Sequence, residues 1–77
     1  MMIKNKIPQI AESNGFTPTE LHRKTTSLSW PTVLGLSSTE KAPEYLPERT
    51  TVKTLVEIAR ALGCNVTDLY SVDFDGA

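Results

Sequence analysis

A wide apolar stripe over residues 52–62 requires this 77-residue chain to fold around at least one amphipathic helix. Its apolar side chains recur three and four positions apart, at Val52, Leu55, Val56, Ile58, Ala59 and Leu62. A threonine at position 50 or 51 can cap the start of this helix, and Gly63 can end it. Because the apolar face must be covered, the sequence predicts further elements that pack against it.

The segment TPTE at 17–20 predicts the start of another helix. The Thr17 hydroxyl can accept a hydrogen bond from the Glu20 N–H, and the Glu20 carboxylate can accept one from the Thr17 N–H. Pro18 fits the first helical position, where the missing N–H is not needed. This capping box predicts a helix over about residues 18–24.

A shorter apolar pattern predicts a helix ahead of the capping box. Ile7, Ile10 and Ala11 follow helical spacing, and Asn14-Gly15 can stop a helix over about residues 8–14. We expect residues 2–6 to lie extended before it.

Residues 28–36, LSWPTVLGL, predict a third short helix beyond a non-helical link at 25–27. Ser29 is the expected cap, and Val33 and Leu36 are the expected core residues. Residues 37–50 contain two prolines and predict a long surface loop, from which Tyr45 and Leu46 can pack back onto the domain.

The end of the chain predicts less regular structure. Residues 67–70 predict a short last turn, and residues 70–74 alternate in polarity like a strand. We expect the tail at 75–77 to be loose.

The order of these elements points to a DNA-binding architecture. Two short capped helices joined by a tight link, followed by a longer amphipathic helix, form a helix-turn-helix pattern. The chain resembles the Cro/cI-type, or XRE-like, helix-turn-helix regulators over about residues 7–70. Three segments carry the resemblance, namely GFTPTEL at 15–21, LSWPTV at 28–33 and TLVEIARALGC at 54–64.

The resemblance implies a mainly all-α fold class: a compact four- to five-helix Cro/cI-type helix-turn-helix domain. We expect residues 1–77 to form this one domain, with a helix-turn-helix core at about 17–36 and a small two-stranded ribbon from the two ends. The chain departs from the family pattern at His22, which replaces a small residue, and at Pro18, which replaces a polar one. The link at 25–27 lacks the usual glycine and is one residue longer, and the loop at 37–50 is longer than is typical.

The resemblance also implies which residues contact DNA. In this family the start of the second helix faces a phosphate, and the start of the third enters the major groove. The expected DNA-binding residues, including cations able to neutralise phosphate, are Thr17, Thr19, Lys24, Ser29, Trp30, Pro31, Thr32, Lys41 and Arg49. Residues 28–36 contain no Arg, Asn or Gln, so we expect hydroxyl, ring and thymine-methyl contacts rather than sharp bidentate readout.

Charge is distributed unevenly along the chain, although the formal net charge is only −1. Residues 1–41 carry five Lys and Arg against three Glu, whereas residues 42–77 carry three against six Asp and Glu. This uneven distribution of charge suits a protein that turns one face toward phosphate. Because the cations are few, we expect each monomer to bind DNA with modest affinity.

Several functional classes lack the residues they need. The sole histidine has no carboxylate placed by the sequence to orient it, and there is no glycine-rich phosphate loop, so we do not expect an enzyme. Cys64 is the single cysteine, which excludes an internal disulfide and predicts a buried structural thiol; we expect no metal and no cofactor. No apolar run approaches the ~18 residues needed to span a bilayer. Since no signal peptide is visible either, we expect a cytoplasmic protein with no membrane partner.

Two functions remain open. The first is a sequence-specific, repressor-like transcriptional regulator of prokaryotic or phage type, which binds the major groove of double-stranded DNA as a homodimer joined through residues 69–74. The second is a helix-turn-helix fold used for binding a protein partner, as in an antirepressor or accessory factor. In that case Trp30, Val33, Leu34 and the 37–50 loop would form an apolar docking patch.

Overall fold

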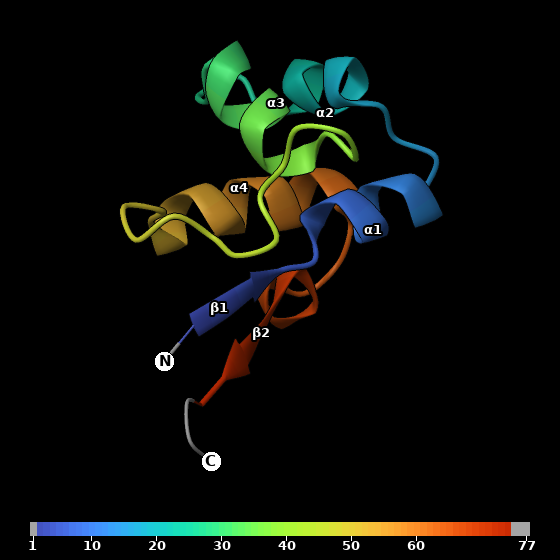
Figure 1. Ribbon diagram of the computed structural model, residues 1–77. Coiled ribbons are helices and arrows are strands. Elements are labelled where there is room, and N and C mark those ends of the chain that lie inside the picture. The colour runs from blue at the N-terminus through green and yellow to red at the C-terminus, as the bar shows by residue number, and fades with distance from the viewer. Residues whose placement is uncertain (1, 75–77) are drawn as a thin grey trace.

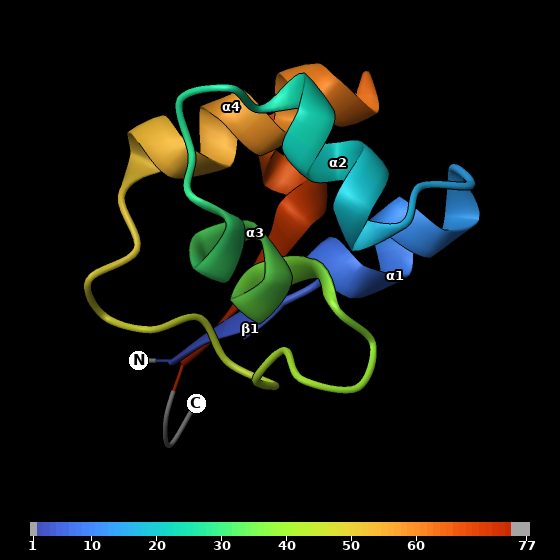
Figure 2. The same ribbon diagram turned by 90° about the horizontal axis from the view of Figure 1, so that it is seen from above.

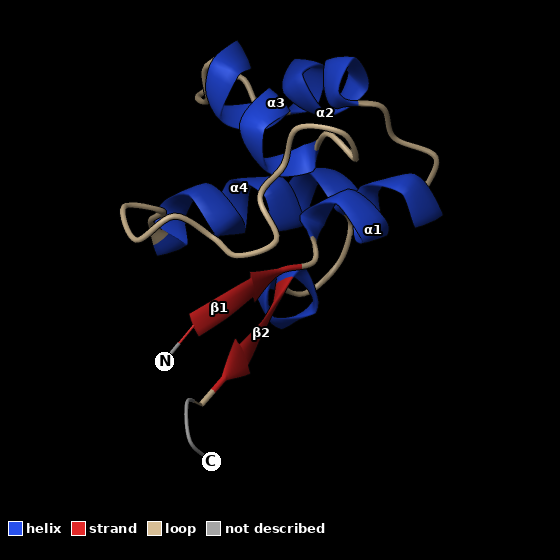
Figure 3. Ribbon diagram, in the orientation of Figure 1, coloured by secondary structure: helices blue, strands red, loops and turns tan. Residues whose placement is uncertain are grey.

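The computed structural model describes residues 2–74, and within that range it contains four α-helices, one short 3₁₀ helix and a two-stranded sheet. In chain order the elements are β1 (Met2–Asn5), α1 (Ile7–Ser13), α2 (Pro18–Lys24), α3 (Trp30–Ser37), α4 (Val52–Leu62), the 3₁₀ helix η1 (Val66–Leu69) and β2 (Tyr70–Asp73). Figure 3 shows that helices dominate and that the two strands lie side by side. The predicted mainly α-helical class with a small ribbon is confirmed, while the tail at 75–77 lies outside the described residues.

The helix pair α2 and α3 lies on one side of the molecule, and the β1–β2 ribbon lies on the opposite side, with α1 and α4 between them (Figure 1). The two strands are antiparallel, with Ile3 opposite Val72 and Asn5 opposite Tyr70. Directly opposite residues of an antiparallel pair share a face, so these four side chains lie on one face of the ribbon. Because the ribbon lies on the opposite side of the molecule, it does not cover the α2–α3 pair (Figure 1).

Local capping interactions set the ends of the helices as the sequence predicts. The Glu20 N–H donates to the Thr17 Oγ1 at 3.2 Å, and the Thr17 N–H donates to the Glu20 Oε1 at 3.4 Å. Thr51 is the cap of α4, since its Oγ1 accepts from the Thr54 N–H at 3.2 Å. Gly63 ends α4 with a φ of 71°, a left-handed conformation that glycine adopts without strain.

Two helices differ slightly from the predicted boundaries. α1 begins at Ile7 and ends at Ser13, one residue earlier than expected at each end. α3 includes Ser37, whose Oγ donates to the Val33 carbonyl oxygen at 2.6 Å, so the connection to α4 spans residues 38–51. Neither difference exposes a predicted core residue.

One cluster of buried apolar side chains joins the elements. Each of α1, α2, α3, α4 and η1 contributes a side chain with no exposed surface, namely Ile7, Leu21, Val33, Ile58 and Leu69. Val52 and Val56 also belong to the predicted stripe but are 71% and 38% exposed. The buried face of α4 is therefore narrower than the sequence pattern indicates.

The connection at 38–51 is not a free surface loop, because part of it pairs with β1. The Asn5 N–H donates to the Glu44 carbonyl at 2.8 Å, and the Leu46 N–H donates to the Ile3 carbonyl at 2.7 Å. Tyr45 lies between these bonds and forms an antiparallel bridge to the same strand. The predicted return of residues 45 and 46 to the domain is confirmed, and the backbone pairing with β1 is a feature that the sequence did not predict.

Asn5 is the buried polar residue that connects these segments, with 7% of its surface exposed. Its Nδ2 donates to the carbonyls of Leu36 and Pro43 at 3.1 and 3.3 Å, and its Oδ1 accepts from the Ile7 N–H at 3.0 Å. Ile7 begins α1 and Leu36 lies in the last turn of α3, where backbone groups lack helical partners. One amide side chain therefore caps two helix ends and holds the loop.

Candidate nucleic-acid interface

A buried threonine fixes how α3 follows α2. Thr25 has no exposed surface, and its Oγ1 donates to the Leu21 carbonyl oxygen at 2.9 Å. The Leu28 N–H then donates to the Thr25 carbonyl at 3.0 Å and turns the chain toward α3. The link between the two helices is thus a defined turn that satisfies its buried polar groups without a glycine.

The first turn of α3 presents its side chains to solvent. Figure 2 shows α2 and α3 side by side on the face toward the viewer. Ser29, Trp30, Pro31 and Thr32 are exposed, and Val33 is buried beneath them. Ser29 occupies the predicted N-cap position, but its Oγ bonds to the Thr32 Oγ1 at 2.8 Å instead of capping a backbone N–H. The start of α3 can therefore offer two hydroxyls and two ring surfaces to a partner, whereas the buried Val33 cannot join a docking patch.

Trp30 contacts His22, a residue of α2. Their ring centroids lie 5.5 Å apart and the ring planes meet at 69°, which is an edge-to-face arrangement. Trp30 is 39% exposed, and His22 is half-buried. The sequence did not predict the pairing; the one signal for it is that His22 stands where the resemblance expects a small residue.

Arg49 is the predicted cation that the fold brings to the start of α3. It lines a groove of about 310 Å³ together with Pro31 and Thr32 from α3 and Thr54 from α4. The long connection between α3 and α4 carries it there, although Arg49 and Pro31 are far apart in the sequence. A guanidinium in this place can contact a DNA phosphate at the edge of the major groove that α3 would enter.

Lys24 and Lys41 do not line the groove that contains Arg49. Lys41 follows the far end of that helix, where its backbone N–H donates to the Ser38 Oγ at 3.2 Å. Lys24 ends α2, and its Nζ lies 5.7 Å from the centre of the Phe16 ring. Of the three predicted cations, Arg49 is therefore the one that lines the groove beside the start of α3.

The start of α2 offers fewer free groups than its composition suggests. The Thr17 hydroxyl already contacts the Glu20 N–H and carboxylate, and Pro18 has no N–H. Thr19 is exposed and can present both an N–H and a hydroxyl to a phosphate. The Glu20 carboxylate occupies the same helix start, so an approaching phosphate would meet a negative charge there.

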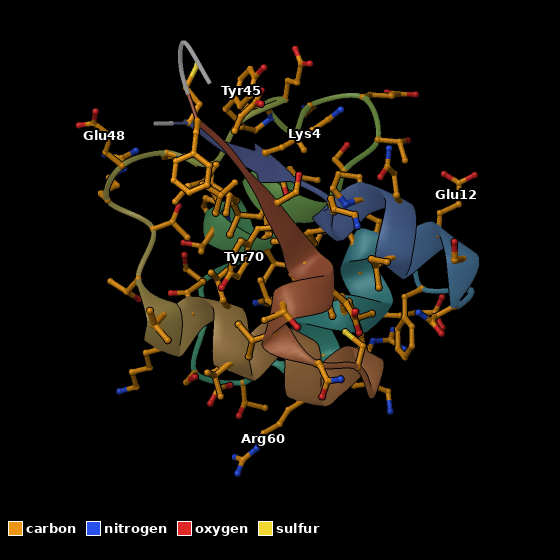
Figure 4. All side chains as sticks on the ribbon, turned by 90° about the horizontal axis from the view of Figure 1, so that it is seen from below. Lys4, Glu12, Tyr45, Glu48, Arg60 and Tyr70 are labelled. Carbon is orange, nitrogen blue, oxygen red and sulfur yellow. The ribbon has the colours of Figure 1, made fainter. Side chains whose placement is uncertain are left out.

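A larger, mainly apolar groove of about 640 Å³ lies on the ribbon side of the molecule. Its walls come from the ribbon, the 45–50 segment, η1 and the first turn of α4, and no residue of α2 or α3 lines it. Figure 4 looks onto this side and shows Glu48 on the connecting segment and Tyr70 at the start of β2, both of which line the groove. This groove is therefore separate from the start of α3.

Cys64 is half-buried against the core rather than fully buried as predicted. Burial raises the pKa of its thiol, and the nearby Asp68 carboxylate raises that pKa further, so the unreactive protonated form is favoured. Among residues 2–74, no three His, Cys, Asp or Glu side chains are grouped as metal ligands. In the same range, every helix is too short or too polar to cross a bilayer.

Comparison with known proteins identifies the family. Residues 6–75 match the family model of the Cro/C1-type HTH DNA-binding domain, a range that includes every element from α1 to β2. Neither the curated proteins nor the solved structures give a significant match to the chain. Because the family model covers far more than half of the sequence, the chain belongs to the Cro/C1-type helix-turn-helix DNA-binding domain family.

Proposed function

We propose that this protein is a sequence-specific, repressor-like transcriptional regulator that binds the major groove of DNA through the start of α3. The observation that carries the proposal is the exposed first turn of α3, which the buried Thr25 holds in a fixed place beside α2. Membership of a DNA-binding family supports DNA as the partner. The proposed activity is binding without catalysis, in the cytoplasm, by one domain whose helix-turn-helix core covers about residues 17–36.

We assign the base contacts to Ser29, Trp30, Pro31 and Thr32, all exposed at the start of α3. Hydroxyl groups can bond to several bases, and ring surfaces can contact a thymine methyl. Such contacts discriminate less sharply than bidentate Arg, Asn or Gln contacts. The proposed readout therefore depends on shape and apolar contact more than on hydrogen-bond pattern.

We assign the phosphate contacts to Thr17, Thr19, Lys24, Lys41 and Arg49. Arg49 has the most direct support, because it lines the groove beside α3 with Pro31 and Thr32. Thr19 is supported by its exposure at the start of α2.

Loss of Arg49 is expected to weaken DNA binding by reducing the electrostatic, salt-dependent contribution to the affinity. Each phosphate that a cation neutralises contributes about 0.9 to the slope of log affinity against log salt concentration. Arg49→Ala should lower that slope by about one and weaken binding to all duplexes alike. Fluorescence anisotropy of labelled duplexes, titrated at low and at moderate salt, measures both quantities.

The matched control is Arg60→Ala, which removes the same charge. Arg60 projects from α4 into solvent (Figure 4) and lines neither groove, so its loss should leave the salt slope unchanged. Equal slope changes in the two variants would contradict the contact assigned to Arg49. A wild-type protein that fails to bind at low salt, or binds without a salt slope, would overturn the DNA-binding proposal itself.

We further propose that the regulator is a homodimer joined through the outer edge of β2. Within residues 2–74 this edge has no strand partner. Apolar side chains are exposed beside it, with Met2 44%, Val72 39% and Phe74 65% exposed. Unpaired strand edges and exposed apolar patches are typical association surfaces. A two-fold dimer would present two copies of α3 to successive half-sites, which one small module cannot span.

Aspartates on the apolar side of β2 are expected to convert the dimer to a monomer. In the Val72→Asp, Phe74→Asp double variant two charges would have to be buried in the interface, and unpaired buried charges are strongly unfavourable. Ser71→Asp is the control, because Ser71 lies on the opposite face of the same strand. Sedimentation equilibrium gives the masses, and circular dichroism verifies that each variant is folded. A monomeric wild type, or a double variant of unchanged mass, would contradict the proposed dimer.

A further inference from the structure

We propose that His22 is a positioning residue: its edge-to-face contact orients the Trp30 indole at the start of α3 and thereby sets the sequence preference of DNA binding. The inference rests on the proposed DNA-binding function and adds the residue that fixes the geometry of readout.

The contact has the geometry of a specific aromatic interaction. The centroids of the His22 and Trp30 rings are 5.5 Å apart and the planes meet at 69°. Aromatic pairs prefer this arrangement because the positive edge of one ring meets the negative face of the other. The orientation of the indole is therefore coupled to the imidazole beside it.

Both rings stand on elements that are fixed relative to each other. His22 lies one helical turn before Thr25, whose buried hydroxyl bonds back to α2, and Trp30 is the first residue of α3. The two rings thus meet across the turn that defines the helix-turn-helix. Since 39% of the Trp30 surface stays exposed, one side of the indole is held while another remains free for a ligand.

Orientation of this ring matters more here than in a helix with charged or amide side chains. Residues 28–36 contain no Arg, Lys, Asn or Gln, so the indole is the largest group that can distinguish one base step from another. A freely rotating indole would have to be ordered when DNA binds, and that ordering opposes binding. Contact with His22 orders the ring beforehand, and rigid aromatic side chains lose little entropy on binding.

A purely structural role for His22 makes a different prediction. If the contact only packs α2 against α3, its loss lowers stability and weakens binding to every duplex by the same factor, whatever residue stands at position 30. If His22 positions Trp30, its loss lowers the preference among duplexes, and this effect vanishes once the indole is gone. A double-mutant cycle between the two positions separates these cases.

The experiment begins with a duplex that the wild-type protein selects from a random pool and a scrambled duplex of equal length. The affinity ratio for the two duplexes is measured at one salt concentration for the wild type and for H22A, H22F, W30A and the H22A, W30A double variant. The interaction free energy typical of an edge-to-face aromatic pair predicts that H22A lowers this affinity ratio by about two- to tenfold. The H22F variant keeps an aromatic ring and should recover most of the loss, while H22A should cause no further loss in the W30A background.

Fluorescence of the free protein provides an independent readout, because Trp30 is the only tryptophan. In H22A the indole should become more mobile in time-resolved anisotropy and more accessible to acrylamide, and H22F should reverse both changes. An unchanged duplex preference in H22A, or an equal loss with and without Trp30, would overturn the positioning role while leaving the proposed function intact. A wild type that selects no duplex from the random pool would overturn the proposed function and this inference together.

Discussion

Replacement of Ile58 by alanine is expected to lower the free energy of unfolding by about 2–5 kcal/mol. Ile58 has no exposed surface and lies in the middle of α4, on the face that packs against the other helices. The truncation removes buried methyl and methylene groups and leaves a cavity that a close-packed core fills only in part. A globular domain of 77 residues is held by roughly 4–11 kcal/mol, so this one change removes a large part of the stability.

Val52→Ala is the control on the same helix. Val52 is 71% exposed, and its truncation should change the stability by less than about 0.5 kcal/mol. Urea unfolding followed by circular dichroism at 222 nm measures both variants. If Ile58→Ala does not fold, Ile58→Val keeps the comparison possible, with an expected loss of about 0.5–1.5 kcal/mol. Equal losses at positions 58 and 52 would contradict the burial of Ile58.

The helices could be predicted because their signals are local. The capping box at Thr17 and Glu20 joins residues three positions apart, and Gly63 ends α4 by its own backbone preference. Apolar spacing alone places Leu55 and Ile58 on the buried face of α4. Such patterns can be read without knowing which elements meet in space.

The connection between α3 and α4 could not be predicted in the same way. Its prolines and charges are typical of a surface loop, yet the backbone of Glu44 and Leu46 bonds to β1. Strand pairing of this kind depends on backbone N–H and C=O groups, and every residue except proline carries both, so the pairing leaves little mark on the composition of the loop. The role of Asn5 could not be predicted either, because the two carbonyls to which its Nδ2 donates lie 31 and 38 positions away in the sequence.

The exposure of residues at the start of α3 could be predicted from the sequence, but the arrangement of the surrounding charges could not. The exposure of Ser29 and Thr32 agrees with helical spacing, because Val33 and Leu36 must face the core. The separation of Lys41 from Arg49 depends on the path of the connecting loop, which no local pattern encodes. Which of the predicted cations lies beside the start of α3 could therefore be learned only from the tertiary structure.

Replacement of Asn5 by alanine is expected to destabilise the protein by about 2–4 kcal/mol through lost hydrogen bonds and unpaired buried groups. The change removes the donor to the Leu36 and Pro43 carbonyls and the acceptor for the Ile7 N–H. Two of these groups lie at the ends of α1 and α3, where no helical hydrogen bond can replace the lost one. Urea unfolding gives the loss directly.

Asn14→Ala is the matched control for Asn5→Ala, because the Asn14 Nδ2 also donates to a backbone carbonyl, that of Ile10 at 2.8 Å, but at an exposed site. Water can replace that bond, so the control should lose less than about 0.5 kcal/mol.

Asn5→Asp keeps an acceptor for the Ile7 N–H but turns a carboxylate oxygen toward the Leu36 carbonyl. Burial beside a carbonyl raises the pKa of the new carboxyl group above its unfolded value, so its protonated form is the one the fold favours. Asn5→Asp should therefore be the least stable variant near neutral pH and should recover relative to Asn5→Ala as the pH falls. Equal losses for Asn5→Ala and Asn14→Ala would show that the buried amide does not hold the two helix ends together.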